Sequence, residues 1–507
     1  MKNKKFRNAS KAIIFVLVAV IIYSSLNPIF KPKWLDQNAE TSFAQHFYEF
    51  DKDKIEMIFL GSSQITCCID TVELYEKYGI LAYDLGGSLN TLTVNYYWML
   101  DALSRHKTIN TVVVDTSLVF NGDNDLDANF RKNLDYMRWS KYKYQAVEAY
   151  YENFETPSTL EDSKFETMIN FAFPMMRYHS RWNDLDEVDF NVEKYDLMNC
   201  LGFSPTASRW QPNLPYEDFC IENDTVDKTE LFDEVQYNYL IKIIDECKSR
   251  NINCVLIKTP KAAWSLTGHN FIQKLADEKD VPFLEFTTDK ALKEIGYVYE
   301  QDMRDRDHLN ARGSVKLADW LGNYFIENGY KFTDYRGSGV VDKKTLNRYH
   351  KQRNLAYLNS TLTPEEFLKE LNKRDYDVAI QSSADITDYW TPELQKQLEK
   401  YGFTLDIASL HGMKYTAVVQ DGKTTLELVS PDKIETAFKV IPSTKIKLVT
   451  AFSETTTKVG RDSPLKYSKN GLRLTAFDKD TGNLVSRATF YVEDDELKLN
   501  VDLEDKA

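Results

Sequence analysis

A serine and an Asp-x-x-His sequence, far apart in the chain, supply the residue types that activate a hydroxyl nucleophile. Gly61-Ser62-Ser63 follows the apolar run at 55–60, and Asp305-Arg306-Asp307-His308 lies about 240 residues later. A serine hydroxyl becomes a strong nucleophile when a histidine removes its proton, and a carboxylate must fix the histidine tautomer and stabilise its charge. We therefore predict Ser63 as nucleophile, His308 as base and Asp305 as orienting acid, with Asp307 as the alternative acid.

A sheet must bring these residues together. Between them, short β-rich runs alternate with helical patterns, which is typical of βαβ units and of a parallel sheet covered by helices on both faces. The predicted strands are 57–60, 81–85, 111–116, 254–258 and 282–286. Ser63 then lies at the carboxyl edge of the sheet, where such folds bind ligands, and His308 precedes a helix predicted at 314–325.

Over residues 54–330 the chain resembles the SGNH (GDSL-like) hydrolase superfamily, in which Gly-Asp-Ser holds the nucleophile and Asp-x-x-His completes the triad. Gly61-Ser62-Ser63 stands in place of Gly-Asp-Ser. The likeness is greatest to the membrane-anchored branch that includes the D-alanyl transfer protein of teichoic acid synthesis and polysaccharide O-acetyltransferases. The resemblance implies a flavodoxin-like parallel sheet and serine esterase or acyltransferase activity, which needs no cofactor.

The same resemblance names candidates for the oxyanion hole. Residues 83–90, Tyr-Asp-Leu-Gly-Gly-Ser-Leu-Asn, are similar to the family loop Asn-Leu-Gly-x-Ser-Gly-Gln, although Leu89 stands where glycine is usual. Gly87 and Asn90 are the candidate donors in this loop. The next family element, Gly-x-Asn-Asp, occurs late, at 122–125, where Asn124 is either an oxyanion donor or part of an ordinary Asx-rich turn.

The amino terminus has the pattern of a membrane anchor. Five basic residues between positions 2 and 11 precede an apolar run at 12–23, which continues more weakly to position 30. The run is shorter than the roughly 20 residues of a spanning helix, so a cleaved signal peptide is the alternative. No small-x-small cleavage site follows, which favours an uncleaved signal anchor at 1–33. The positive-inside rule then places the rest of this single-pass protein outside the cytoplasm, at the cell membrane.

Composition narrows the class of partner. The chain has 63 Lys and Arg against 77 Asp and Glu, a net charge of −14, and residues 1–33 hold seven basic and no acidic side chains, so residues 34–507 carry −21. An acidic ectodomain argues against nucleic acid, and we expect a neutral glycan or a polymer reached through a local pocket. The six cysteines and seven histidines lack metal-ligand spacing, so no metal site is predicted. Cys200 and Cys220 are candidates for a disulfide, and the other four cysteines are expected to be buried thiols.

The connection at about 120–228 is far longer than a usual crossover and is rich in Tyr, Trp, Phe and Met. We predict that it forms a helical cap over the serine, with these side chains as the core of the cap. The alternative is that some of them line an acceptor groove or pack against a membrane partner. Lys258 and Lys261, at the end of the fourth predicted strand, are expected to be solvated, with contact to an anionic substrate group as the alternative.

Residues 331–371 form a charged, weakly apolar stretch that suits a linker, with a helix predicted at 364–371. At 372–507, strands predicted at 377–381, 415–420, 424–429, 446–451, 472–478 and 484–491, with a helix at 391–401, indicate a separate α+β domain. Residues 374–492 resemble the interleukin-like EMT inducer fold, above all in Asn-Gly-Leu-Arg-Leu-Thr-Ala-Phe-Asp at 470–478, followed by Thr481-Gly482. That resemblance implies a glycan-binding or protein-binding role.

Two functions follow from these patterns. As an enzyme, the chain is expected to acylate or deacylate a cell-surface glycopolymer, a polysaccharide or teichoic acid, through an acyl-enzyme on Ser63, beside a multispanning membrane O-acyltransferase that exports the acyl group. As a catalytically degenerate protein it would instead bind glycan or act as a scaffold for such a partner. Geometry separates the two, because an enzyme needs His308 within hydrogen-bond reach of both Ser63 and Asp305.

Overall fold

A five-stranded parallel sheet forms the centre of the first half of the chain. The computed structural model describes residues 2–33, 46–120, 126–153, 163–190, 200–221, 232–261, 264–452 and 454–502. The strands are β1 (Met57–Leu60), β2 (Ala82–Asp84), β3 (Thr111–Asp115), β4 (Asn253–Lys258) and β5 (Phe283–Glu285), in the order β2-β1-β3-β4-β5. All neighbouring pairs are parallel. Each strand predicted from the sequence is present, with its ends shifted by no more than one residue.

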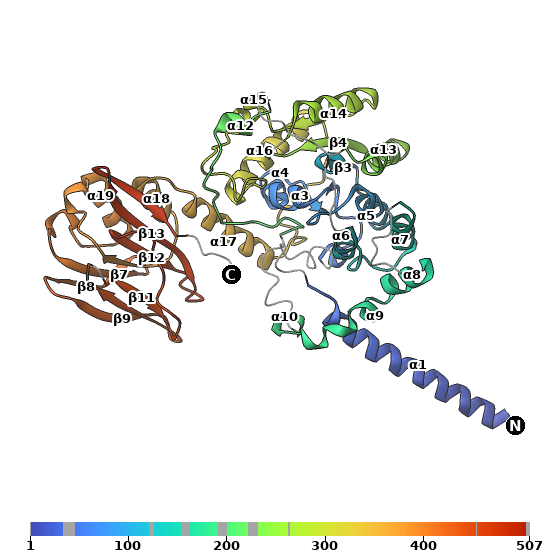
Figure 1. The fold of residues 1–507 in the computed structure, drawn as a ribbon, viewed down its shortest axis with the longest axis horizontal. Helices are drawn as coiled ribbons and strands as arrows, with labels where there is room; N and C mark the ends of the chain where they lie inside the picture. The colour runs from blue at the N-terminus through green and yellow to red at the C-terminus, as the bar shows by residue number, and fades with distance from the viewer. Residues whose placement is uncertain are drawn as a thin grey trace.

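The side chains of β1 explain why helices cover both faces of this sheet. Met57 and Phe59 point into one buried apolar core, and Ile58 and Leu60 point into another. Successive strand residues face opposite sides, so a fully apolar strand must be covered on both. The helices that supply this cover are α5 (Leu92–Arg105), α13 (Glu234–Ser249) and α14 (Leu266–Glu278) on one face, and α3 (Ser63–Cys68), α15 (Asp289–Glu294) and α16 (Ala311–Glu327) on the other, with α4 (Thr71–Tyr78) packed against α16 (Figure 1).

The insertion between β3 and α13, predicted as a helical cap over the serine, is largely helical in its described residues. Its elements are η2 (Ser117–Phe120), α6 (Leu126–Leu134), α7 (Lys141–Asn153), α8 (Lys164–Ala172), α9 (Pro174–Tyr178), η3 (His179–Asn183), α10 (Glu187–Phe190) and α12 (Tyr216–Phe219). Helices α6 and α7 pack against α5, while α9, η3 and α10 pack against the N-terminal helix α1 (Figure 1). Segment 200–221 bonds to α3 and to the segment before His308, since Ser204 N donates to Thr66 O and Trp210 N donates to Met303 O. Helix α6 reaches residues 83–90, since Asn133 Nδ2 donates to Ser88 O over 3.4 Å.

Helix α1 (Lys2–Phe30) projects away from the sheet (Figure 1). Its segment Ser10–Phe30 has a mean hydropathy of 2.3, and the apolar side chains from Ile13 to Ile22 are exposed. A helix of this length and composition is able to serve as a membrane anchor or as a signal sequence.

The carboxyl-terminal unit is built on two antiparallel sheets. Their orders are β14-β13-β12-β6-β7-β8 and β11-β10-β9. The strands are β6 (Asp377–Ser382), β7 (Lys414–Gln420), β8 (Lys423–Ser430), β9 (Ile434–Ile441), β10 (Thr444–Thr450), β11 (Thr456–Val459), β12 (Leu472–Phe477), β13 (Leu484–Glu493) and β14 (Glu496–Val501), and the helices are α18 (Pro364–Leu371), α19 (Pro392–Tyr401), η4 (Thr387–Tyr389) and η5 (Ile407–Ser409). Phe367 of α18 and Leu394 of α19 cover one face of the larger sheet, and Phe438 and Ile446 of the smaller sheet cover the other. The six strands and both helices predicted here are present, and β9, β11 and β14 were not predicted.

The segment predicted as a linker contains a 17-residue helix, α17 (Lys343–Asn359), that contacts both units. Tyr349 Oη donates to Asp70 Oδ2 over 2.8 Å, which joins α17 to α4. At the other end, Ser486 Oγ of β13 donates to Asn359 Oδ1 over 3.0 Å. The connection between the two units is therefore a packed helix.

All six cysteines are buried free thiols, and the suggested Cys200–Cys220 disulfide is absent. Cys200 belongs to the apolar core on one face of the parallel sheet, whereas Cys220 belongs to the core on the opposite face. The sheet between the two cores prevents the two sulfur atoms from meeting.

Candidate active site

Ser63 is the first residue of α3 and follows the end of β1 by three positions. Ser62 caps the helix, because its hydroxyl accepts a hydrogen bond from Gln64 N over 3.3 Å. Gly61 is required by close packing, since a Cβ there would lie 2.5 Å from Ile65 Cγ1 and 2.6 Å from Asp115 Cβ. This tight strand-to-helix turn leaves Ser63 half-buried while both of its neighbours are buried. The Ser63 hydroxyl is therefore held at the sheet edge with access from outside.

His308 joins Ser63 to Asp305, although Ser63 and His308 are 245 positions apart in the sequence. The Nε2 atom of His308 lies 2.8 Å from Ser63 Oγ, and its Nδ1 atom lies 2.9 and 3.0 Å from the two carboxylate oxygens of Asp305. These distances are those of a serine activated by a histidine that a carboxylate orients. The structure thus brings together the three residues that the sequence analysis selected.

Asp305 is held as an anion. Its Oδ1 accepts the backbone N–H groups of Asp307 and His308 over 2.8 and 2.9 Å, and Arg304 Nε donates to its Oδ2 over 3.0 Å. Partial burial acts to raise the pKa of Asp305, but the contacts with His308, the Asp307 N–H and the Arg304 charge outweigh it and lower the pKa to about 2. Among the described contacts, Asp307 meets this site through its backbone, so Asp305 is the acid that faces His308.

Gln64 is a buried residue of the site that sequence reasoning missed. Its Nε2 donates to Asp307 O over 2.6 Å, and its Oε1 accepts from Thr259 Oγ1 over 2.7 Å. One amide therefore ties the nucleophile helix to the His308 loop and to the end of β4. Its position directly after Ser63 was the available signal, because a polar side chain there follows a buried strand.

The Gly86-Gly87 pair lies against the nucleophile turn. A Cβ on Gly86 would lie 2.7 Å from Ser62 O, so this position needs glycine for close approach. Gly87, a predicted oxyanion donor, is buried beside it, and its carbonyl accepts from Asn90 N over 3.0 Å. Leu89 has a φ of 51°, which is in the left-handed region that favours glycine.

Asn90 supports the turn through a second amide. Its Oδ1 accepts from Thr91 N over 2.9 Å, and its Nδ2 donates to Asn95 Oδ1 over 3.1 Å. Asn95 Nδ2 in turn donates to Gly61 O over 3.2 Å. This network gives Asn90 a positioning role. The third candidate donor, Asn124, lies outside the described residues.

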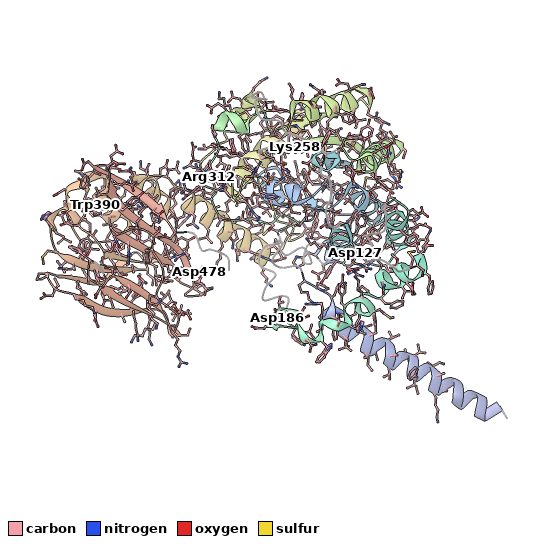
Figure 2. The ribbon with its side chains drawn as sticks, viewed as in Figure 1. Asp127, Asp186, Lys258, Arg312, Trp390 and Asp478 are labelled. Carbon is pink, nitrogen blue, oxygen red and sulfur yellow. The ribbon has the colours of Figure 1, made fainter. Side chains whose placement is uncertain are left out.

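Lys258 is fully buried in the sheet unit, which corrects the expectation of a solvated side chain (Figure 2). Its Nζ donates to Thr259 O over 3.0 Å and lies 5.2 Å from the centre of the Trp264 ring. Burial lowers the pKa of Lys258 to about 8, against the opposing effect of Asp115. Lys261, three positions on, is half-buried.

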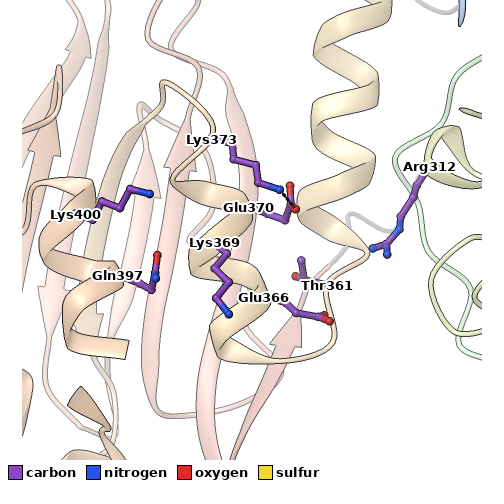
Figure 3. A pocket seen from close by; sticks show the side chains of 8 residues that line it. All are labelled: Arg312, Thr361, Glu366, Lys369, Glu370, Lys373, Gln397 and Lys400. Carbon is purple, nitrogen blue, oxygen red and sulfur yellow. Dashed lines mark hydrogen bonds and ion pairs between the residues drawn. The ribbon is translucent and has the colours of Figure 1, made fainter. Parts of the chain in front are cut away.

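A polar pocket of about 360 Å³, separate from the Ser63 site, is lined by residues of α16, α18 and α19 (Figure 3). It is lined by Arg312, Thr361, Glu366, Lys369, Glu370, Lys373, Gln397 and Lys400. Glu370 pairs with Lys373 over 2.6 Å, whereas no ion pair to Lys369 or Lys400 occurs among the described residues. The ammonium groups of Lys369 and Lys400 therefore line this pocket together with the carboxylate of Glu366, and none of the three belongs to an ion pair among the described residues.

No group of three or more His, Cys, Asp or Glu side chains within the described ranges is arranged to hold a metal ion. Comparisons of the chain with protein-family models, with curated proteins and with solved structures found no match. The chemistry of this protein must therefore be inferred from the geometry of the site.

Proposed function

We propose that this protein is an extracytoplasmic serine esterase or acyltransferase that acts on cell-envelope glycopolymers. The observation that carries the proposal is the hydrogen-bonded line from Asp305 through His308 to the half-buried Ser63. The strand order β2-β1-β3-β4-β5 supports a flavodoxin-like SGNH hydrolase, because that order places a ligand crevice at the carboxyl ends of the central strands.

In the proposed mechanism, His308 Nε2 takes the Ser63 proton as Ser63 Oγ attacks the carbonyl carbon of an ester. The tetrahedral intermediate expels the alcohol, which receives that proton from His308, and leaves an acyl group on Ser63. Water or a sugar hydroxyl then loses its proton to His308 and attacks the acyl carbon, and Ser63 Oγ recovers a proton as it departs. Asp305 stabilises the charged His308 in both halves, and the Gly87 N–H is the proposed oxyanion donor.

The acyl acceptor decides between hydrolysis and transfer. The N-terminal anchor and the acidic ectodomain favour a site at the outer face of the membrane, with surface polysaccharide or teichoic acid as acceptor. A multispanning membrane O-acyltransferase that exports the acyl group is the proposed partner.

The test is active-site labelling of the full-length protein in detergent with a fluorophosphonate, followed by mass spectrometry of the adduct. We expect an adduct on Ser63 that is lost in Ser63→Ala and in His308→Ala. The control Ser249→Ala changes an exposed serine on α13 and should label as the parent does. Absence of any adduct, together with intact small acetyl esters, would contradict an activated serine.

A second candidate function, glycan binding without catalysis, is favoured by the polar pocket beside α18 and α19. Its cationic side chains outnumber its carboxylates, so Lys369 and Lys400 suit a carboxylate- or phosphate-bearing segment of a polymer, in keeping with the proposed interleukin-like EMT inducer type of the carboxyl-terminal unit. We expect Lys369→Ala with Lys400→Ala to weaken binding of an acidic oligosaccharide in calorimetry. Lys396→Ala, an exposed α19 lysine outside the pocket, is the matched control. Equal binding by both variants would exclude this pocket.

A further inference from the structure

The end of α1 is fixed against the insertion by buried polar contacts. Lys33 and Asp189 form an ion pair over 3.2 Å, with side chains that are 5% and 1% exposed. Lys33 Nζ also donates to the carbonyl oxygens of Pro28 and Lys31 over 2.5 and 2.6 Å. Arg181 of η3 donates to Phe30 O over 2.7 Å and pairs with Asp189 over 3.1 Å. The helix is therefore joined rigidly to η3 and α10.

Further contacts extend this junction to both sides of the end of α1. Tyr136 Oη donates to Pro32 O over 2.6 Å, and Met175 N donates to Asn27 Oδ1 over 3.2 Å. Tyr23 packs edge-on against Phe173, with ring centres 5.6 Å apart. All of these contacts use residues 23–33, which cleavage of a signal peptide would remove in whole or in part. The junction favours a retained anchor.

Four large apolar side chains are exposed beside this junction, and we name them the anchor-side patch. They are Phe173, Met176, Trp182 and Phe190, with exposed fractions of 44%, 57%, 67% and 66%. Met176, Trp182 and Phe190 belong to α9, η3 and α10, which contact α1, and Phe173 contacts Tyr23. In Figure 1, α9 and α10 lie where α1 leaves the rest of the molecule.

The lipid bilayer is the binding partner that best fits the anchor-side patch. If α1 spans a membrane, the membrane surface must lie close to the end of α1, and the elements that carry the patch lie at that end. Tryptophan and phenylalanine are enriched where protein meets the headgroup layer, and helices as short as α9 and α10 are able to lie on that layer but not to cross it. The nearby charges of Lys33, Arg181 and Asp189 are paired with one another, whereas Asp184, Asp186 and Glu187 are exposed beside the patch. This mixture of apolar and charged side chains suits the polar headgroup layer and not the hydrocarbon core.

We propose that the anchor-side patch rests in the headgroup layer of the membrane that α1 enters. The protein is then held at the membrane by two features, a spanning helix and an interfacial segment made by α9, η3 and α10. This interfacial segment sets the orientation of the Ser63 site relative to the membrane surface. The inference rests on the proposed anchor role of α1 and goes beyond the proposed chemistry.

The test is tryptophan quenching by brominated lipid, with the full-length protein reconstituted in phosphatidylcholine vesicles. We expect bromine-dependent quenching that decreases in Trp182→Phe and is unchanged in Trp210→Phe, a half-buried tryptophan whose backbone bonds to Met303. Adding Phe190→Trp to the Trp182→Phe variant should restore quenching, which also controls for misfolding. Equal quenching in the parent and in Trp182→Phe, with no gain from Phe190→Trp, would overturn the proposal.

Two further readouts on the same vesicles separate the possible failures. Loss of the protein from the vesicles on alkaline extraction would overturn the anchor role of α1 and the inference with it. If the protein stays in the vesicles on alkaline extraction but Trp182 is not quenched, the interfacial role of α9, η3 and α10 is contradicted while the anchor role of α1 stands. A protein partner would then be the molecule that covers the anchor-side patch. Fluorophosphonate labelling of Ser63 reports the proposed chemistry independently of both.

Discussion

At the scale of single residues, two acids separated by one position have different environments. Asp305 faces the His308 ring and accepts two backbone N–H groups, whereas the described contacts of Asp307 with the site come from its backbone. A carboxylate orients a catalytic histidine only through a direct contact with its Nδ1. The placement of the two side chains therefore assigns the orienting role to Asp305 and not to Asp307, although both are aspartates.

Asp305→Asn should lower the hydrolysis rate of an activated acetyl ester by on the order of 10⁴-fold, because the amide supports the wrong His308 tautomer. Asp307→Asn keeps the backbone contacts and should retain a rate within a few-fold of the parent. Steady-state kinetics of both variants give the comparison. A similar loss in the two variants would contradict the role assigned to Asp305.

Lys258→Met should raise the free energy of unfolding at pH 7 by on the order of 3–4 kcal/mol, because burial lowers the Lys258 pKa from 10.5 to about 8 and one pKa unit is worth about 1.4 kcal/mol. Below about pH 8 the lysine is charged in both states, so the full cost of burial is present. Between about pH 8 and 10.5 the unfolded state binds more protons, so the stability of the parent rises with pH and the gain from methionine shrinks.

Denaturant unfolding at pH 7 and at pH 10 measures this difference. Lys261→Met, the same substitution three positions away at a half-buried site, should change stability by less than about 0.5 kcal/mol. A gain from Lys258→Met that is equal at the two pH values would show that packing, not charge burial, produces it.

At the scale of secondary-structure elements, the site depends on three segments that one side chain connects. Gln64 of α3 bonds to the loop that carries His308 and to Thr259 after β4. A hydrogen bond of this kind fixes the distance between the nucleophile and its base, and catalysis is sensitive to displacements of about 1 Å. Gln64 is thus a positioning residue.

Gln64→Ala should slow the reaction of Ser63 with a fluorophosphonate by on the order of 10 to 100-fold, with little change in KM for an ester substrate. Gln273→Ala, a half-buried position on α14 whose side chain bonds to Asp277 of the same helix, is the matched control and should react at the parent rate. A parent-like rate for Gln64→Ala would remove Gln64 from the site.

At the scale of the whole molecule, α17 couples the sheet unit to the carboxyl-terminal unit through a buried acid. Asp70 caps α4 by accepting Glu73 N over 2.9 Å and also accepts the Tyr349 hydroxyl of α17. Burial raises the pKa of Asp70 to about 7, although the Glu73 N–H and the Tyr349 hydroxyl oppose it. The junction between the two units is therefore sensitive to pH.

Asp70→Asn should increase the free energy of unfolding at pH 8 by on the order of 4 kcal/mol, because asparagine keeps the cap and the acceptor without the buried charge. The raised pKa means that the folded state binds more protons between about pH 4 and 7, so parent stability falls as pH rises through that window. The advantage of the variant should vanish below about pH 4. Thermal unfolding across this range is the measurement.

Asp342→Asn is the matched control at the N-cap of α17. Partial burial there is outweighed by hydrogen bonds from Thr345, which lower the pKa of Asp342, so loss of the charge brings no gain in stability. A pH-independent effect of Asp70→Asn would contradict the linkage.

Local patterns in the sequence determined the five parallel strands, the triad residues Ser63, His308 and Asp305, and most of the second unit. Apolar runs, turn residues and caps act over a few positions, so they can be read without the fold. The strands β9, β11 and β14 were missed because most of their residues are only half-buried and many are charged or polar, which weakens the apolar signal of a strand.

The tertiary structure decided the features that depend on contacts between distant segments. It buried Lys258, placed Cys200 and Cys220 in opposite cores, joined Gln64 to a carbonyl 243 positions away, and turned the expected linker into a packed helix. It also packed α6 and α7 of the insertion against α5, and α9, η3 and α10 against α1. The burial of a side chain, the pairing of charges and the separation of two thiols all depend on which distant segments pack together. The pattern of neighbouring residues in the sequence does not say how far apart such segments lie in the fold.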